Sequence, residues 1–122
     1  MKKLLYIILL TSTCFLSAGQ IWTQYDFRVD NPEAAARIVA ASDELMSSDF
    51  AKNNFQGSSH LDAYIANGSN TATHSFAVLQ PSMAAHQDWM NALQNSPEGQ
   101  KFFSAMNANS TPITERINSF MQ

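Results

Sequence analysis

Apolar and polar side chains alternate along residues 21–29 with a period of two. This alternation predicts a strand that buries one face and leaves the other open. The apolar face carries Ile21, Tyr25, Phe27 and Val29. The opposite face carries Trp22, Gln24, Asp26 and Arg28.

A helical pattern follows this strand. Asn31 is suited to cap the first turn, and Pro32 fits the first helical position because its missing N–H needs no partner there. From Ala35 to Phe50, apolar side chains recur every three or four residues, which is typical of a helix with one buried face. We predict a single helix that ends near residues 53–55.

Residues 59–66 and 71–79 form the next pair of predicted strands, joined by a turn at residues 67–70 that contains Gly68. If Ala66 pairs with Thr71, the register of the whole hairpin follows. The polar face of the hairpin then carries His60, Asp62, Tyr64, Thr73 and Ser75. The apolar face carries Leu61, Ala63, Ile65, Ala72, His74 and Phe76.

Two helices and a last strand complete the predicted elements. Ser82 is placed to cap one helix, and Ser96 precedes Pro97 at the start of the next. Residues 111–121 are predicted as a strand, with a helix as the alternative. The order strand, helix, strand, strand, helix, strand predicts an α+β fold of the ferredoxin-like βαββαβ type, in which helices cover one face of a four-stranded antiparallel sheet.

Three stretches resemble the antibiotic-biosynthesis monooxygenase group of dimeric α+β barrels. They are residues 74–82, residues 85–89 with His86 and Trp89, and residues 96–103. The resemblance follows the element order over residues 20–120 and implies a ferredoxin-like chain that pairs into a dimeric barrel. This fold carries oxygenases, haem-degrading enzymes, isomerases and proteins without known chemistry. Haem-degrading members have a His near positions 103–106, where this chain has none.

Size and charge narrow the functional classes. The chain has 122 residues, about the size of one domain. Its formal net charge of −3 argues against a nucleic-acid partner held by phosphate contacts. Hydrophobic residues make up 45% of the chain, too many for a disordered segment. We therefore expect one globular domain that does not bind nucleic acid.

Residues 1–19 have the pattern of a secretory signal peptide. Lys2 and Lys3 precede an apolar run at residues 4–10, and small residues at 17–19 offer a cleavage site. We expect the chain to be exported through this signal and to be periplasmic or secreted. Membrane contact would then be limited to the signal peptide before cleavage.

Cleavage would leave residues 20–122 as a single α+β barrel-like domain. Two alternatives stay open, a lipoprotein modified at Cys14 and a retained anchor, although a membrane span needs about 20 mostly apolar residues. Cleavage also removes the only cysteine, so the exported domain would have no disulfide. A small domain without cross-links buries little surface, which favours a homodimer.

The polar face of the predicted sheet is the candidate site, because the open faces of two such sheets would enclose the barrel of a dimer. Its aromatic and polar side chains suit a small organic ligand. The predicted ligand-binding residues are Trp22, Gln24, Asp26, Arg28, Tyr64, Thr73 and Ser75. His60 and Asp62 are the predicted catalytic residues, because two positions apart on a strand they can act as an acid–base pair.

Simpler structural roles are the alternatives for these groups. His60 and Asp62 also fit a solvated sheet face, His74 a core histidine, and His86 the edge of a core built around Trp89. A metal ion would need a third ligand such as Asp26, and we expect neither a metal nor another cofactor.

Three functions stay open. The first is an exported dimer that binds a small organic molecule in its barrel. The second is an enzyme similar to cofactor-independent monooxygenases or isomerases, with His60 and Asp62 as acid–base groups. The third is a structural or interaction protein without a ligand. The sequence leaves open whether the chain is an enzyme.

Overall fold

One sheet and four helices make up residues 19–119, the part that the computed structural model describes. The strands are β1 (Ile21–Arg28), β2 (Ser58–Ala63), β3 (His74–Gln80) and β4 (Thr111–Ser119). The helices are α2 (Pro32–Ser47), α3 (Asp49–Asn54), α4 (Met83–Gln94) and α5 (Pro97–Asn109). Apart from Gly19, the predicted signal peptide lies outside the described residues, as does Met121.

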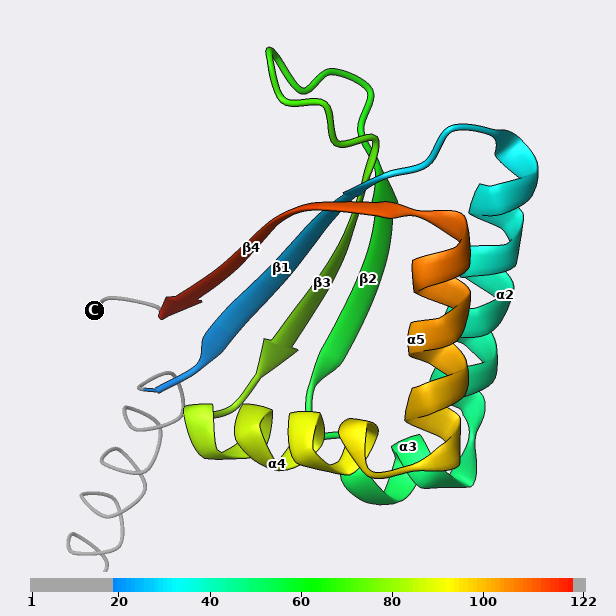
Figure 1. The fold of residues 1–122 in the computed structure, drawn as a ribbon. Helices are drawn as coiled ribbons and strands as arrows, with labels where there is room; N and C mark the ends of the chain where they lie inside the picture. Colours follow the sequence, from blue (N-terminus) through cyan, green and yellow to red (C-terminus); the bar gives the residue numbers. More distant parts are fainter. Residues whose placement is uncertain (1–18, 120–122) are drawn as a thin grey trace, which may run out of the picture.

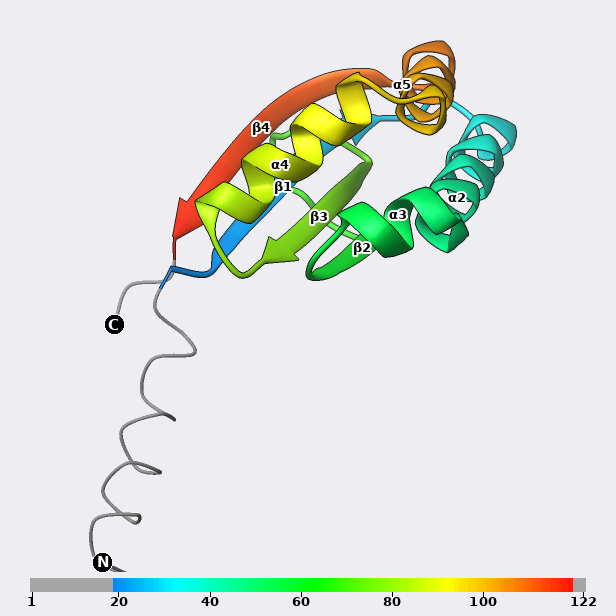
Figure 2. The same ribbon diagram turned by 90° about the horizontal axis from the view of Figure 1, so that it is seen from below.

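The strand order is β2-β3-β1-β4, and all neighbouring strands are antiparallel. The helices lie on one side of this curved sheet (Figures 1 and 2). The predicted α+β fold of the ferredoxin-like type is therefore confirmed. In the described part of the chain, no helix has the length and apolar character needed to cross a bilayer.

The hairpin has the predicted register over its regular part. His60 pairs with Ala77 and Asp62 with Ser75. Strand β2 ends at Ala63 and β3 begins at His74, so both stop short of the predicted turn. The N–H of Tyr64 still donates to the carbonyl of Thr73 at 2.8 Å. The connection between them projects beyond the sheet (Figure 1). The predicted turn at residues 67–70 was therefore too short.

Side chains explain why the ladder stops there. Asn67 Nδ2 donates to the carbonyl of Ala72 at 3.1 Å, and the N–H of Ala72 donates to Asn70 Oδ1 at 2.9 Å. These bonds replace strand pairing with local turns, a known behaviour of Asn side chains.

The prediction of a single helix after residue 31 is wrong, because the helix is interrupted at Ser48. This residue has an extended backbone, with φ −69° and ψ 154°. Its N–H donates to the carbonyl of Leu45 at 3.2 Å, and its hydroxyl accepts from the N–H of Ala51 at 3.1 Å. Ser48 thus ends α2 and caps α3, a role that the apolar periodicity could not reveal.

Helices α4 and α5 begin as predicted. Ser82 accepts from the N–H of Ala85, and Ser96 from the N–H of Gly99. The turn between the helices is tight, because a Cβ on Gly99 would lie 1.9 Å from the carbonyl oxygen of Leu93.

Residues 111–119 form a strand, which decides between the two predicted alternatives. β4 pairs with β1 from Thr111 opposite Arg28 to Ser119 opposite Ile21, with a register shift between Asp26 and Phe27. Pairing along this whole length satisfies backbone groups that an isolated strand would leave open.

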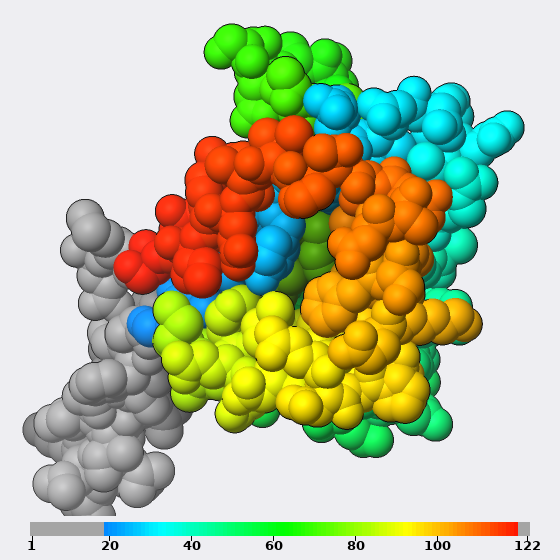
Figure 3. Space-filling view, in the orientation of Figure 1, coloured from blue at the N-terminus to red at the C-terminus, as the bar shows by residue number. Residues whose placement is uncertain are grey.

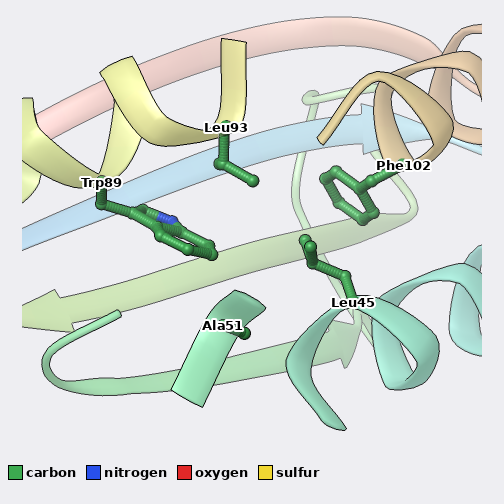
Figure 4. Close-up of a cluster of buried hydrophobic side chains, with 5 residues drawn as sticks. All are labelled: Leu45, Ala51, Trp89, Leu93 and Phe102. Carbon is green, nitrogen blue, oxygen red and sulfur yellow. The ribbon is translucent and has the colours of Figure 1, made fainter. Parts of the chain in front are cut away.

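The core lies between the sheet and the helices. Leu45, Ala51, Trp89, Leu93 and Phe102 converge from the four helices (Figure 4). The indole of Trp89 packs against Phe50 and Phe55, with ring centroids 5.7 and 5.0 Å apart. The prediction that Trp89 is a core residue is confirmed.

A second cluster joins the sheet to the first helix. It consists of Phe27, Val29, Ala34 and Ile38. His74 stacks on Phe27 with ring centroids 5.7 Å apart, and its Nδ1 lies 2.8 Å from the hydroxyl of Thr73. His74 is thus a hydrogen-bonded histidine on the helix-covered side, as its register predicted.

Candidate functional site

The predicted polar face exists on the side of the sheet without helices, here called the open face. Register places Gln24 opposite Ala77, Asp26 opposite Ser75, and Asp62 on the other side of Ser75. Trp22 of β1 and His60 of β2 stack with ring centroids 6.5 Å apart. Sequence alternation therefore located this face correctly.

Asp26 is the centre of a hydrogen-bonded network on the open face. Its side chain is 1% exposed. One carboxylate oxygen accepts from the hydroxyl of Tyr64 at 2.7 Å and from Gln24 Nε2 at 2.9 Å. The other accepts from Arg116 Nη2 at 2.5 Å and from Thr114 Oγ1 at 3.5 Å. Four donors thus satisfy a carboxylate that is hidden from water.

These contacts keep Asp26 ionised. Burial alone would raise its pKa, but the hydrogen bonds from Tyr64 and Gln24 and the charge of Arg116 outweigh burial and hold the pKa of Asp26 below its ordinary value. Burial and the hydrogen bond to Asp26 raise the pKa of Tyr64. The pair is a fixed anion and a neutral donor near neutral pH, which suits a structural role.

Arg116 and Thr114 were not among the predicted residues. Both lie on β4, and only a strand over residues 111–119 brings them beside Asp26. The sequence did contain a signal for this strand, because the polar residues Thr114, Arg116 and Asn118 alternate with the apolar residues Ile113 and Ile117.

The predicted acid–base pair lies at the exposed edge of the sheet. His60 and Asp62 are both exposed on β2. Within residues 19–119, no hydrogen bond or ion pair joins them, and no three metal-ligating side chains come together. Their catalytic role stays a prediction that depends on a second chain covering this face.

The other two predicted residues have local partners. Arg28 forms an ion pair with Asp30, with Nε and Oδ1 3.3 Å apart. Thr73 accepts from the N–H of Val29 at 2.8 Å and so ties the hairpin to the end of β1. Both contacts hold the chain at one end of the sheet.

A cavity of about 360 Å³ lies on the opposite side, between the sheet and helices α4 and α5. In the space-filling view it is the hollow between β4, α4 and α5, with β1 and β3 at its floor (Figure 3). Its walls are mostly aromatic rings and methionines. They include Phe27, Phe76, Trp89, Met90, Phe102, Phe103 and Met106.

Tyr25 and His86 are two of the polar side chains that line this cavity, together with Asp26, Asn107, Ser110, Thr114 and Glu115. The hydroxyl of Tyr25 has only a weak acceptor, Met90 Sδ at 3.8 Å, and burial together with the charge of Glu115 raises the pKa of Tyr25 to about 12. His86 is 7% exposed, and its Nδ1 lies 2.9 Å from Gln80 Oε1. Burial lowers the pKa of His86, and Glu115 opposes this shift.

The arrangement offers a phenol donor and an uncharged imidazole on an apolar wall. The sequence placed Tyr25 on the buried face and His86 at the edge of the core, both correctly. It could not reveal the cavity, because the space arises only when α4, α5 and β4 pack over β1 and β3.

Comparison with known proteins rests on structure. No protein-family model and no curated protein matches the sequence. A dimeric ferredoxin-like protein of unknown function from Thermobifida fusca matches with a TM-score of 0.64 at 9% identity, over 87% of this chain and 95% of that one. The chain has a ferredoxin-like fold.

Two enzymes share this ferredoxin-like fold. The cofactor-independent oxygenase SnoaB from Streptomyces nogalater matches with a TM-score of 0.59 at 17% identity, over 86% of this chain and 96% of that one. The hydroxynitrile lyase of Passiflora edulis matches with a TM-score of 0.61 at 13% identity, over 85% and 95%. The suspected resemblance is confirmed as a likeness of fold, and the fold serves different reactions.

Proposed function

We propose that the chain is an exported homodimer that binds a small, mainly apolar organic molecule in the cavity between the sheet and helices α4 and α5. The observation that carries the proposal is a space lined mostly by aromatic rings and methionines, with a few polar side chains, Tyr25 and His86 among them, on its wall. Sites for small organic ligands have this composition.

The size of the cavity indicates the size of the ligand. A dry cavity of about 150 Å³ holds one benzene molecule. The cavity of about 360 Å³ therefore suits a molecule of about two fused rings. This volume lies near the lower end of the range of roughly 300–1,000 Å³ found for ligand pockets.

A homodimer would cover the open face. The Thermobifida fusca neighbour is described as dimeric, which supports this part of the proposal. Trp22, His60 and Asp62 would then face a second copy, as the barrel prediction requires. Export is proposed from the signal-peptide pattern of residues 1–19 alone.

An acid–base enzyme without a cofactor is the second candidate function. The observation in its favour is the neutral imidazole of His86, which lines the same cavity as the hydroxyl of Tyr25. A neutral imidazole can accept a proton from a bound substrate, and a phenol can stabilise the charge that results. The oxygenase and lyase with this fold make such chemistry reasonable to test.

Binding of 1-naphthol, followed by its fluorescence, tests the location of the site. Ile113 is half-buried on β4 and lines the cavity, so Ile113→Trp is expected to fill the mouth and abolish binding. Ile117, also on β4, is 46% exposed and outside the lining, so Ile117→Trp is the matched control.

The alternative site gives the opposite pattern. If His60→Ala or Asp62→Ala abolishes binding while Ile113→Trp does not, the ligand lies in the barrel of the dimer and the helix-side site is wrong. Native mass spectrometry of the exported chain tests the dimer. Its mass also shows whether the chain begins at Gln20, and a chain that still carries residues 1–19 would contradict cleavage.

A further inference from the structure

We infer that Gln80 sets the tautomer of His86, so that Nε2 is a hydrogen-bond acceptor in the cavity, and that the ligand is a neutral molecule with a donating hydroxyl, such as a phenol or an enol. The ligand class rests on the proposed function, whereas the tautomer does not.

The orientation of the Gln80 amide is the first step. Gln80 is 1% exposed at the end of β3. Its Nε2 donates to the carbonyl of Ala85 at 3.4 Å, while Oε1 lies 2.9 Å from His86 Nδ1. A carbonyl can only accept, so the NH₂ group of the amide belongs beside Ala85 and the amide oxygen beside the ring.

The tautomer of His86 follows from this orientation. An amide oxygen is also only an acceptor, so Nδ1 must carry the proton that it donates. In a neutral imidazole the other nitrogen then has a free lone pair. Nε2 of His86 is therefore an acceptor.

This lone pair has no partner in the described part of the chain. Among residues 19–119, Nε2 forms no hydrogen bond, and the fully enclosed side-chain atoms without a partner are Thr23 Oγ1 and Ser42 Oγ. Nε2 is not one of them, so it is not fully enclosed by protein, and because His86 lines the cavity we place Nε2 there. A ligand that donates to Nε2 would satisfy the ring.

The charges around the ring exclude an acidic ligand. Gln80 from β3 contacts the ring with a neutral amide, Glu115 from β4 acts on its charge, and Tyr25 and Asp26 from β1 line the same cavity. Burial keeps the imidazole uncharged by lowering its pKa. A carboxylate ligand would have no proton to donate, and it would be repelled by Glu115. A neutral hydroxyl donates to His86 and can accept from Tyr25.

Nitrogen-15 NMR of the histidine rings in the ligand-free protein tests the tautomer directly. His86 is assigned by the signal lost in His86→Phe. The wild type is expected to show the proton on Nδ1. Gln80→Met, which keeps the volume and removes the acceptor, is expected to lose this preference. A proton on Nε2 in the wild type, or an unchanged tautomer in Gln80→Met, would overturn the assignment.

Gln80→Glu keeps the test valid if Gln80→Met does not fold. The new carboxylate still accepts from Nδ1, so the tautomer is expected to persist. Because a negative charge stabilises imidazolium, the ring should also titrate at higher pH than in the wild type. An unchanged titration would show that residue 80 does not contact Nδ1 and would overturn the assignment.

Matched naphthalene probes test the ligand class. 1-Naphthol can donate to Nε2, whereas 1-methoxynaphthalene cannot. One hydrogen bond corresponds to roughly 2- to 12-fold in affinity, and we expect the wild type to prefer 1-naphthol by such a factor. Gln80→Met should reduce the ratio towards one.

The outcomes test the ligand class and the tautomer of His86 separately. If neither probe binds the wild type, the proposed function and the ligand class both fail, while the NMR result still decides the tautomer. If both probes bind equally and the proton is on Nδ1, the cavity is a ligand site but the ligand class is wrong.

Discussion

Replacing Tyr64 by Phe would remove one hydroxyl from the buried carboxylate of Asp26. The hydroxyl donates to Asp26 Oδ1 at 2.7 Å, and the side chain of Asp26 is 1% exposed, so water has little access to replace it. A hydrogen bond to a charged group contributes about 1.5–3 kcal/mol. Tyr64→Phe is therefore expected to lower the free energy of unfolding by about 2 kcal/mol at pH 7.

Urea denaturation at fixed protein concentration measures this change, since dimerisation would make stability depend on concentration. Tyr25→Phe is the matched control. Its hydroxyl meets only Met90 Sδ, so its loss should cost less than about 0.5 kcal/mol. Equal losses for the two variants, or a loss below about 0.5 kcal/mol for Tyr64→Phe, would refute the network as a source of stability.

The dependence on pH provides a second check. The pKa of Asp26 is lowered in the folded protein, so its contribution is present above the ordinary carboxyl pKa, about 3.9, and is lost as the pH falls through the folded value. Once Asp26 is protonated, the bond from Tyr64 becomes a weaker neutral one. The difference between wild type and Tyr64→Phe should therefore shrink in acid, and a constant difference would argue that the hydroxyl acts elsewhere.

Four further substitutions test the fold and the cavity. Gly99→Ala should cost more than about 3 kcal/mol or prevent folding, because its Cβ would lie 1.9 Å from the Leu93 carbonyl oxygen. A Cβ at Gly68 meets nothing within 4 Å, so Gly68→Ala should cost about 1–2 kcal/mol from its positive φ alone. If Gly99→Ala and Gly68→Ala gave equal yields of folded protein and equal urea midpoints, the clash at Gly99 would not be the cause. Ser96→Ala removes the cap of α5 and should cost about 1 kcal/mol in the same assay. Burial lowers the pKa of His86, so the folded state resists protonation and stability should fall as the pH drops below about 6.5; His86→Gln should flatten this slope, and an unchanged slope would show that His86 is not its source.

The register of the hairpin shows why part of the fold could be predicted from the sequence. The assumed pairing of Ala66 with Thr71 at the turn gave the pairing of His60 with Ala77, and the apolar pattern agreed with it, because a shift of one residue would move every side chain of β2 to the other face. Ser82 and Ser96 were equally accessible, because a helix cap depends on residues three positions apart. These features are local.

The cap at Ser48 is local too, but the apolar stripe concealed it, whereas the state of residues 111–119 depended on other parts of the chain. The apolar stripe continues across Ser48, because α2 and α3 bury their apolar side chains in the same core. Residues 111–119 have a pattern that either a strand or a helix can bury. Pairing with β1 decides for a strand and brings Arg116 to Asp26.

The candidate site also has one part that the sequence predicted and one part that it did not. By itself the sequence determined which side chains share a strand face, because alternation along a strand has a period of two residues, and it placed the polar face of β1, β2 and β3 correctly. Only the tertiary structure decided that the cavity lies on the opposite face. A cavity is the volume that remains when segments distant in the chain pack imperfectly, and no local pattern records that volume.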